Sequence, residues 1–589
     1  MIFPKPKSEK YYEEKYTLKS YGDNTDIMYL YNKYKFGNVD LNVILNKSYT
    51  DDEYSICIDK DCIKITAAGD CGVFRAVSSL KQLIKEYGKD LPQCEIKDDP
   101  DFKKRSYMLD ISRCRMPKVD TITKLIDLLD DLKYNEFQLY MESFVFKYDT
   151  LPEYTKDFDC LGPEDIKYLD KYCSDRFIEL VPNQASFGHL KNWLELDEFK
   201  HLRVGDEDTN TATINPLLEE SFEFVDKFYS ALLPNFTSGY VNIGLDEAGG
   251  LGKYQLEEIC KEKGKENVFL DWLHKLSDHI AKKYNKKVQF WADMLYDYPE
   301  AYGRVPEGAV ALNWGYDLIK SAMMEKRCVD LQAKGTPYYI CPGNCTWISF
   351  TGRFDVMNFN VRTCGEIGRK YGAIGYMMTD WGCGEGHYHF PVWSIVPCAL
   401  GAQYAWNVGE EQNGERIKFD YVRAAQKYAD ENVYNAKISW HLERLQQYYL
   451  LEPERVHGRT ICGYTIRLPL SETKGLELFD LKVCGDDFYF DNVIYYVQKI
   501  LGELDKIDFD EKWKRQIYIN ARMVILSAEL CKIRINQKAE SSKINELVAL
   551  IDDIYDEYTY LWDLDNYAKG KEHFLDQLTD RKNELLSMK

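Results

Sequence analysis

Eight short, nearly continuous apolar segments alternate with helical segments between residues 106 and 381, and this alternation limits the possible folds most strongly. Most of the intervening stretches carry the apolar spacing of amphipathic helices. The predicted strands are 106–112, 136–142, 177–183, 240–247, 288–295, 309–314, 337–343 and 373–381. About eight such units are what a (β/α)8 TIM barrel of the α/β class requires, and an open doubly wound sheet is the competing topology.

Polar side chains follow the ends of these predicted strands, which favours the barrel. In a barrel the carboxyl ends of all strands surround one mouth, and the loops there carry the chemistry. At these ends the sequence places Asp110, Arg113, Glu142, Asn183, Gln184, Asp246, Glu247, Asp293, Asn313, Trp314, Asp380 and Trp381, with His189 and Trp347 in following loops. Any one of them alone would be explained as a solvated loop residue or a helix cap. Together, a ring of carboxylates, amides and indoles suits a carbohydrate, because hydroxyls need acceptors and a pyranose face stacks on Trp.

The segments on either side of the predicted barrel have other patterns, so three domains are expected in a chain of 589 residues. Residues 1–99 combine a hairpin signal around Lys60–Asp61 with a helical pattern over 72–88, and predict a small N-terminal α+β domain. The catalytic barrel is predicted over 100–408. Residues 409–589 carry helical periodicity with few turn signals, and predict a helical C-terminal domain.

Charge and cysteine content limit the partners and the compartment. The net charge of −20 argues against nucleic acid and against an anionic membrane surface as partners. The N-terminal residues contain no apolar stretch of signal-peptide length, and 17 cysteines are scattered along the chain, so we expect reduced thiols and a cytoplasmic location. His387 and His389 would supply only half of a zinc site. We therefore predict neither a metal nor a cofactor, and the sequence leaves the oligomeric state unknown.

Two adjacent carboxylates, Asp246 and Glu247, end the fourth predicted strand just before a glycine-rich turn. Paired carboxylates serve glycoside hydrolysis, but they flank the scissile bond and normally come from different strands. Neighbouring strand side chains point to opposite faces, so the strand must twist at its end if both acids serve one site. An adjacent pair suits a mechanism in which one acid protonates the leaving oxygen while the other orients a substrate group that is itself the nucleophile.

These motifs resemble those of glycoside hydrolase family 20, the β-N-acetylhexosaminidases. "VNIGLDE" is similar to the fourth-strand signature of the family, "YMLDISRCRMP" to its first strand, and "LVPNQASFGHL" to its third-strand pattern, with His189 in the histidine position. "FWADML", "ALNWGYD", "CPGNCTW" and "GYMMTDWGCGEGH" resemble later strand ends of a bacterial subgroup with an appended helical domain. The sequence departs from the family at Ala185, where many members carry Asp, and at "QLYMESF", where many have a "WH" strand.

The resemblance implies an exo-acting enzyme that removes terminal β-linked N-acetylglucosamine or N-acetylgalactosamine from oligosaccharides or glycoconjugates, with the substrate's acetamido group as nucleophile. Asp246 would then orient the acetamido group. Glu247 would donate a proton to the leaving oxygen, for which its pKa must be raised. The substrate-binding residues implied are Arg113, Glu142, His189, Trp291, Trp314, Tyr339, Trp347, Asp380 and Trp381, with Tyr339 as the candidate contact of the acetamido carbonyl.

Two alternatives stay open. The first is a carbohydrate-binding barrel that has lost turnover, against which the intact Asp246–Glu247 pair speaks. The second is a retaining glycosidase with two carboxylates, which would use Glu142 or Asp293 as its nucleophile. The preference between gluco and galacto sugars, the linkage, the aglycone and the tolerance of sulfation depend on loop shapes that the sequence does not specify.

Overall fold

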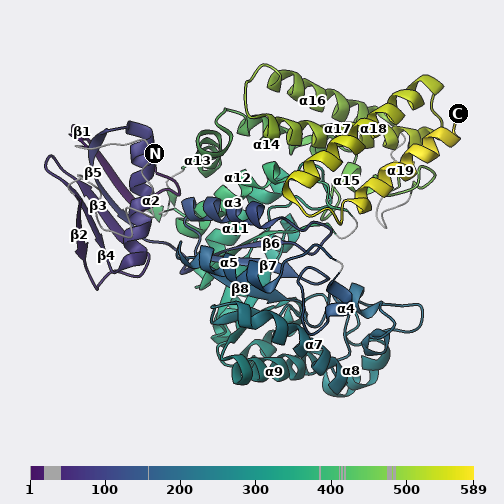
Figure 1. Ribbon diagram of the computed structural model, residues 1–589, viewed down its shortest axis with the longest axis horizontal. Coiled ribbons are helices and arrows are strands. Elements are labelled where there is room, and N and C mark those ends of the chain that lie inside the picture. Colours follow the sequence, from purple (N-terminus) through teal and green to yellow (C-terminus); the bar gives the residue numbers. More distant parts are fainter. Residues whose placement is uncertain are drawn as a thin grey trace.

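A closed barrel lies between a small N-terminal sheet domain and a group of C-terminal helices (Figure 1). This is the predicted fold class. The computed structural model describes residues 2–18, 41–156, 158–383, 386–409, 411–412, 415–416, 419–473, 480–481 and 486–589. Part of the N-terminal domain and two residues of the eighth-strand motif, 384 and 385, thus lie outside the described residues.

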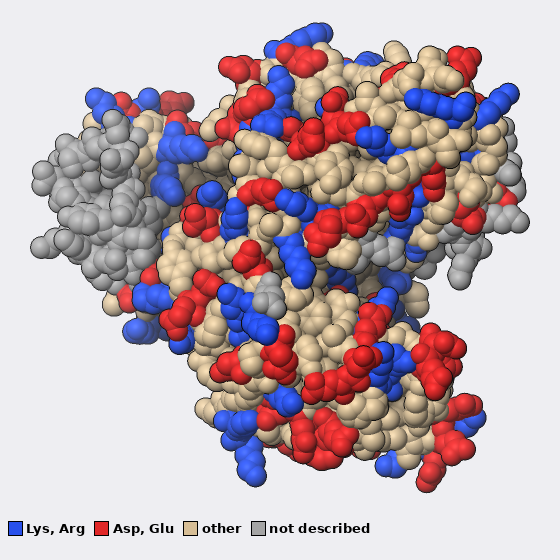
Figure 2. Space-filling view, turned by 45° about the vertical axis from the view of Figure 1, so that its right-hand side comes forward, with Lys and Arg blue, Asp and Glu red and all other residues tan. Residues whose placement is uncertain are grey.

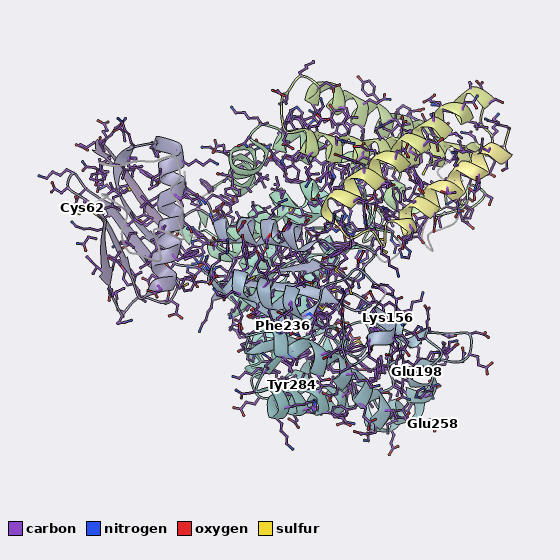
Figure 3. All side chains as sticks on the ribbon, viewed as in Figure 1. Cys62, Lys156, Glu198, Phe236, Glu258 and Tyr284 are labelled. Atoms are coloured by element: carbon purple, nitrogen blue, oxygen red, sulfur yellow. The ribbon has the colours of Figure 1, made fainter. Side chains whose placement is uncertain are left out.

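The N-terminal domain is a five-stranded sheet packed against helix α2 (Asp70–Tyr87). Its strands, in the order β1-β5-β3-β4-β2, are β1 (Ser8–Thr17), β5 (Asp90–Asp98), β3 (Tyr54–Ile58), β4 (Ile63–Ala67) and β2 (Leu41–Leu45). The expected hairpin is β3–β4, with Cys62, labelled in Figure 3, just before β4. Helix α2 ends where the sequence predicts, because Gly88 has a φ of 66°, which glycine adopts without strain.

Eight parallel strands form the barrel, and β13 pairs with β6 to close it. This pairing excludes the open sheet. The strands are β6 (Lys104–Asp110), β7 (Glu136–Met141), β8 (Glu179–Gln184), β9 (Tyr240–Asn242), β10 (Lys287–Trp291), β11 (Val310–Trp314), β12 (Tyr338–Cys341) and β13 (Gly375–Asp380). Each lies within or overlaps a predicted strand. Nearly all strand residues are buried, because one face fills the barrel and the other packs under helices, which explains the continuous apolar runs.

Helices between the strands form the outer layer of the barrel. They are α3 (Val119–Asp131), α4 (Pro152–Thr155), α5 (Pro163–Ser174), α6 (Lys191–Leu194), α7 (Glu219–Leu232), α8 (Glu257–Lys263), α9 (Lys265–Tyr284), α10 (Leu318–Lys334), α11 (Phe354–Lys370) and α12 (Ile395–Trp406). Tyr284, labelled in Figure 3, ends α9, and the left-handed Asn285 (φ 55°) turns the chain into β10.

The C-terminal part is helical, as predicted. Its helices are α13 (Tyr421–Ala429), α14 (Ser439–Leu445), α15 (Ile461–Thr465), α16 (Phe488–Leu504), α17 (Glu511–Asn536), α18 (Ser541–Asp565) and α19 (Glu572–Ser587). Two strands of two residues each, β14 (Glu411–Gln412) and β15 (Glu415–Arg416), pair antiparallel before the first of these helices. Asn520 of α17 accepts a hydrogen bond from Trp393 Nε1 (2.7 Å) and donates to the Tyr388 carbonyl (2.7 Å), which ties this part to the barrel. No described helix has the length and apolar character needed to cross a membrane.

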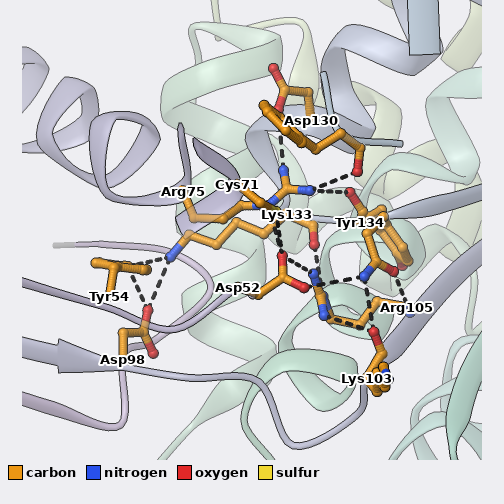
Figure 4. A network of polar contacts seen from close by, with 12 residues as sticks. Asp52, Tyr54, Cys71, Arg75, Asp98, Lys103, Arg105, Asp130, Lys133 and Tyr134 are labelled. Atoms are coloured by element: carbon orange, nitrogen blue, oxygen red, sulfur yellow. Dashed lines mark hydrogen bonds and ion pairs between the residues drawn. The ribbon is translucent and has the colours of Figure 1, made fainter. Parts of the chain in front are cut away.

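A buried ion network joins the N-terminal domain to the amino ends of the barrel strands (Figure 4). Asp52 accepts hydrogen bonds from Arg105 Nη2 (2.8 Å) and Arg75 Nε (3.2 Å), which belong to β6 and α2. Nearby, Lys133 Nζ lies 3.2 Å from Asp98 Oδ2. Because each buried charge has an opposite partner, the network fixes the domain to the end of the barrel remote from the strand-end polar residues.

Candidate active site

A cavity of about 490 Å³ opens at the carboxyl ends of the strands, between the barrel loops and one segment of the C-terminal part. Its walls bring together most of the predicted site residues, which are Asp246, Glu247, Arg113, His189, Trp314, Trp347 and Trp381. Glu142, Trp291, Tyr339 and Asp380 are not among its walls.

The loop after β9 turns both acids toward this cavity. Strand β9 ends at Asn242, and the backbone then passes through left-handed conformations at Gly244 (φ 72°), Leu245 (φ 77°) and Glu247 (φ 45°). Non-glycine residues adopt such angles at a cost, so the surrounding contacts must hold them. The Glu247 N–H donates to Asp293 Oδ2 (2.9 Å). The expected twist at the strand end is therefore present.

Asp246 offers an unused acceptor to the cavity. Its side chain is buried, with only 5% of the residue exposed. One carboxylate oxygen, Oδ2, lies 3.2 Å from His189 Nε2. The other, Oδ1, is buried without a hydrogen-bond partner in the described chain. Because a buried carboxylate oxygen without a donor is costly, this atom is suited to accept a hydrogen bond from a bound molecule.

His189 bridges the two acids. Its Nε2 lies 3.2 Å from Asp246 Oδ2 and 3.4 Å from Glu247 Oε2, and its Nδ1 lies 3.5 Å from Glu142 Oε2. Burial lowers the pKa of His189, but the negative charge of Asp246 and hydrogen bonds to both acids outweigh it and raise the pKa well above its ordinary value. The ring is therefore a cation at neutral pH and binds both carboxylates.

Glu247 differs electrostatically from the sequence-based expectation. Its side chain is 57% exposed, and the hydrogen bond from His189, together with the charges of Arg113 and Lys320, lowers its pKa. The expected rise in the pKa of Glu247 was wrong, because cations and not only apolar walls surround this carboxylate. The raised pKa belongs instead to Asp293, where burial and the charge of Asp246 bring it to about 7.

Arg113 is held at the cavity wall by two acids and two rings. Its Nη1 donates to Asp110 Oδ2 (2.9 Å), and its Nη2 lies 3.2 Å from Glu142 Oε2. The guanidinium lies over the rings of Tyr140 (5.1 Å) and Trp381 (4.8 Å). Glu142 is thus placed beside Arg113 and behind the cavity wall.

Tyr316 is the centre of an aromatic group that the sequence analysis missed. Its ring stacks on Trp314 (centroids 5.2 Å apart) and meets Trp347 edge-on (5.0 Å). Its hydroxyl accepts a hydrogen bond from Trp381 Nε1 (2.6 Å), so the Tyr316 proton itself is available to an acceptor in the cavity. The sequence did contain one signal for Tyr316, because this residue follows Trp314, at the end of a predicted strand, by two positions.

Trp291 is fully buried beneath the site, and its ring centroid lies 5.8 Å from that of Trp381.

Tyr339 and Asp380 point elsewhere. The Tyr339 hydroxyl donates to Glu136 Oε2 (2.9 Å), at the amino end of β7, so this ring lies deep inside the barrel. Asp380 accepts from Tyr107 (2.8 Å) and lines a separate cavity of about 390 Å³. Because neighbouring strand residues alternate, Trp381 facing inward places Asp380 outside the barrel. We therefore leave both residues out of the proposed substrate contacts.

The C-terminal part contributes walls that no local motif indicated. His457, Arg459 and Arg467 line the cavity from the segment around α15. His457 Nδ1 lies 2.9 Å from Asp317 Oδ2, just before α10. His457 and Asp317 lie 140 positions apart in sequence (457 − 317), so only the folded chain brings them together.

Comparisons with known proteins agree on one family. Residues 102–353 match the model of the glycosyl hydrolase family 20 catalytic domain, and residues 6–99 match the model of domain 2 of that family, so the two matches cover more than half of the chain. A β-hexosaminidase of Vibrio furnissii is 23% identical over 358 residues, which are 54% of this chain and 56% of that protein. β-Hexosaminidase 1 of Coccidioides posadasii is 24% identical over 357 residues, 54% of this chain and 58% of that protein. The chain thus spans little more than half the length of these curated relatives.

Solved structures support the fold. A chitobiase of Flavobacterium johnsoniae superposes with a TM-score of 0.58 at 16% identity, over 98% of this chain and 98% of that chain. A β-N-acetylhexosaminidase of Bacteroides fragilis superposes with a TM-score of 0.56 at 20% identity, over 73% of this chain and 95% of that chain.

Proposed function

We propose, since this chain belongs to glycosyl hydrolase family 20, that it is an exo-acting β-N-acetylhexosaminidase that hydrolyses terminal β-linked N-acetylhexosamine with retention. The observation that carries the proposal is the pairing of Asp246 and Glu247 on one cavity, with Asp246 Oδ1 unpartnered in the described chain. The substrate class is an oligosaccharide or glycoconjugate that ends in such a sugar.

In the proposed first step, the sugar's own acetamido oxygen attacks C1. The acetamido group lies among Trp314, Trp347 and Trp381, whose rings bury its methyl group. Asp246 Oδ1 accepts the amide N–H, and the Tyr316 hydroxyl donates to the carbonyl oxygen. Tyr316 thus takes the role that the sequence analysis gave to Tyr339. The contact with Asp246 strengthens in the transition state, because positive charge develops on the amide there. A contact that is stronger in the transition state than in the bound substrate accelerates the step.

Glu247 moves the proton in both steps. Its carboxyl proton passes to the glycosidic oxygen as the bond to C1 breaks, and an oxazolinium forms within the sugar. The resulting carboxylate then takes a proton from water, whose oxygen attacks C1 from the side that the aglycone left. The bond between C1 and the acetamido oxygen breaks, which regenerates the acetamido group and restores the configuration at C1. The aglycone covers the exposed side of Glu247 when substrate binds, and the loss of water there raises the pKa of this carboxyl from the lowered value that it has in the protein alone.

His189 and Arg113 act as positioning and binding groups. The charged His189 holds both carboxylates at the distances given above, so their oxygens stay directed to the cavity. Arg113, fixed by Asp110 and Glu142, presents its guanidinium to hydroxyls of the terminal sugar.

The two-carboxylate alternative is disfavoured because its candidate nucleophiles, Asp293 and Glu142, already accept hydrogen bonds from other residues of the protein. Asp293 accepts from the Glu247 N–H and from Trp314 Nε1 (3.2 Å). Glu142 accepts from Tyr140 (2.7 Å) and pairs with Arg113. Each acid therefore has a structural partner for its oxygens.

Inhibition and labelling test the proposal. We expect hydrolysis of an aryl β-N-acetylglucosaminide, strong inhibition by a thiazoline analogue and no covalent labelling by a 2-fluoro sugar. Covalent labelling of Asp293 or Glu142 would establish the two-carboxylate mechanism, and thiazoline binding without any turnover would establish the carbohydrate-binding alternative.

We also propose a cytoplasmic location. The support is the 17 scattered cysteines, many of them in the core, such as Cys173, Cys341 and Cys364. Fractionation of cells that produce the protein natively tests this, with activity expected in the cytoplasmic fraction. Activity in the culture medium or the periplasm would contradict it.

A further inference from the structure

Three cationic side chains line the catalytic cavity besides Arg113 and His189, and the proposed mechanism uses none of the three. Lys320 lies in the first turn of α10, and Arg459 and Arg467 come from the C-terminal part on either side of α15. The whole chain carries a net charge of −20, and acidic side chains are spread over the face drawn in Figure 2. A gathering of cations at this cavity therefore runs against the overall composition.

Local contacts place the segment that carries Arg459 next to the first turn of α10. Asp317 is bound by His457 Nδ1 (2.9 Å) and by Arg353 Nη1 (2.7 Å), so the segment that carries Arg459 lies against the start of the helix that carries Lys320. The Arg459 guanidinium lies 4.7 Å from the centroid of the Tyr464 ring, which limits its freedom.

Neither Lys320 nor Arg459 has a carboxylate partner in the described part of the chain. Lys320 Nζ lies 4.9 Å from the Trp314 ring centroid, and the Arg459 Nε donates only to the His457 carbonyl (3.3 Å). Both are half-buried. Two partly desolvated cations that have no described acid beside them, at a substrate cavity, are available to an anion from outside.

We propose that Lys320 and Arg459 form a subsite for an anionic group of the substrate, a sulfate, phosphate or carboxylate, beside the N-acetylhexosamine that is cleaved. This rests on the proposed function. The acetamido sugar is itself neutral and needs no cation beyond Arg113. A guanidinium and an ammonium that line one cavity can bind the oxygens of such anions by charge-assisted hydrogen bonds. Arg467, on the same Tyr464 ring at 4.1 Å, extends the positive surface.

Binding of an anion at this subsite also changes the proton donor. Glu247 is faced by the cations His189, Arg113 and Lys320, which lower its pKa, and by the acids Asp246 and Asp293. An anion that neutralises Lys320 weakens this lowering, so the pKa of Glu247 rises and more of it carries the proton near neutral pH. An anionic substrate would thus help to protonate its own leaving group.

The test compares matched neutral and anionic substrates. The first pair is an aryl β-N-acetylglucosaminide and its 6-O-sulfate; the second is a β-N-acetylglucosaminyl disaccharide with glucose or glucuronate as the second sugar. We expect kcat/KM to be about tenfold higher for the anionic member of at least one pair, as one charged hydrogen bond allows. A preference in the first pair places the anion on the cleaved sugar, and a preference in the second places it on the aglycone.

Variants assign the preference to residues. Arg459→Gln and Lys320→Gln should each reduce the anionic-to-neutral ratio of kcat/KM about tenfold, and Arg459→Lys should restore part of it. Lys326→Gln, an exposed lysine of the same helix paired with Asp330 (2.8 Å), is the matched control and should leave the ratio unchanged. The preference should also fall with added NaCl, since about 0.1 M salt screens charges beyond about 10 Å.

The pH profile separates this role from a merely structural one. For the anionic substrate, the loss of kcat/KM with rising pH should occur at higher pH than for its neutral partner, and Lys320→Gln should abolish the difference. The subsite would be overturned if kcat/KM for both anionic substrates were equal to or lower than that for their neutral partners. It would also be overturned if neither variant changed the anionic-to-neutral ratio of kcat/KM.

If no N-acetylhexosaminide is hydrolysed, the proposed function fails by itself. Calorimetric titration of both substrate pairs then decides on the subsite. Tighter binding of the anionic member of either pair would support it, and equal binding within both pairs would overturn it.

Discussion

Glu247 is the residue on which proton transfer depends, because its carboxyl is the exposed acid of the pair. Glu247→Gln keeps the shape and removes the proton. We expect kcat on a disaccharide to fall by about 10²- to 10⁴-fold, and to fall less on an aryl glycoside with a good leaving group. Steady-state kinetics on both substrates measures this. Glu258→Gln, an exposed glutamate of α8 labelled in Figure 3, is the control. Unchanged turnover of the disaccharide by Glu247→Gln would remove Glu247 from the mechanism.

His189 sets the pH range in which Glu247 holds its proton. The hydrogen bond from charged His189 lowers the pKa of Glu247, so the protonated acid is lost as pH rises through this lowered value. His189→Gln removes the cation, which raises the pKa of Glu247. The decline of kcat/KM on the alkaline side should therefore shift to higher pH in the variant, while the maximal rate falls because the carboxylates lose their bridge. A pH profile on a disaccharide tests this, and an unshifted decline would contradict the assignment.

At single positions the sequence was informative where a polar residue directly follows a strand. Asp246, Glu247 and Trp381 are such residues, and all three line the cavity. Asp380 shows the limit, because alternation along β13 sends it to the opposite face from Trp381. The pKa of Glu247 was not predictable either, since it depends on cations from three separate loops.

Gly188 links two elements, the loop after β8 and the loop after β9. A Cβ at this position would lie 2.1 Å from the Asp246 carbonyl oxygen and 3.2 Å from the Ala248 nitrogen. Gly188→Ala must therefore displace the loop that carries both acids. We expect a loss of about 1–3 kcal/mol in the free energy of unfolding and a large fall in kcat. Thermal unfolding and kinetics measure the two effects.

A second glycine provides the control for this prediction. Gly502 lies inside α16, where an added Cβ meets nothing within 4 Å. Gly502→Ala should keep full activity and stabilise the helix by about 0.5–1 kcal/mol. Wild-type activity in Gly188→Ala would show that the two loops need not approach so closely.

Elements with strong local patterns were predictable from the sequence, and elements that meet only in the folded chain were not. The eight strands follow from continuous apolar runs, and helix α2 ends at a glycine as expected. The approach of His457 to Asp317 has no local signature, because the two segments lie far apart in sequence. Tyr316 follows Trp314 by two positions, but its contacts with Trp347 and Trp381 likewise form only in the folded chain.

For the whole molecule, the ion network around Asp52 holds the N-terminal domain on the barrel. Asp52→Asn leaves Arg105 buried without its acid and leaves Arg75 with only the more distant Asp130 (3.5 Å), and breaking a buried pair in this way costs about 3–5 kcal/mol. Urea unfolding at pH 7 measures the loss. Asp131→Asn, whose partner Lys81 is exposed (3.3 Å), is the control and should cost no more than about 1 kcal/mol. Equal stability of both variants would show that the network does not fix the domain.

Acid should erase the difference between the wild type and Asp52→Asn. Burial opposes ionisation of Asp52, but Arg105 and Arg75 outweigh it and hold the pKa of this carboxyl well below its ordinary value. Its contribution to stability is therefore complete above the unfolded-state pKa of about 3.9 and is lost as pH falls toward the folded-state value. Unfolding measured from pH 7 down to pH 3 should show the two proteins converging.

The central claim is that the acetamido group of the substrate, steered by Asp246, is the nucleophile. Fluorination of the acetyl group makes its carbonyl oxygen a weaker nucleophile while changing its size little. The most direct measurement is kcat/KM for aryl glycosides with N-acetyl, N-fluoroacetyl, N-difluoroacetyl and N-trifluoroacetyl groups. The mechanism predicts a steep fall with each added fluorine. A flat series would contradict it and place the nucleophile on the protein.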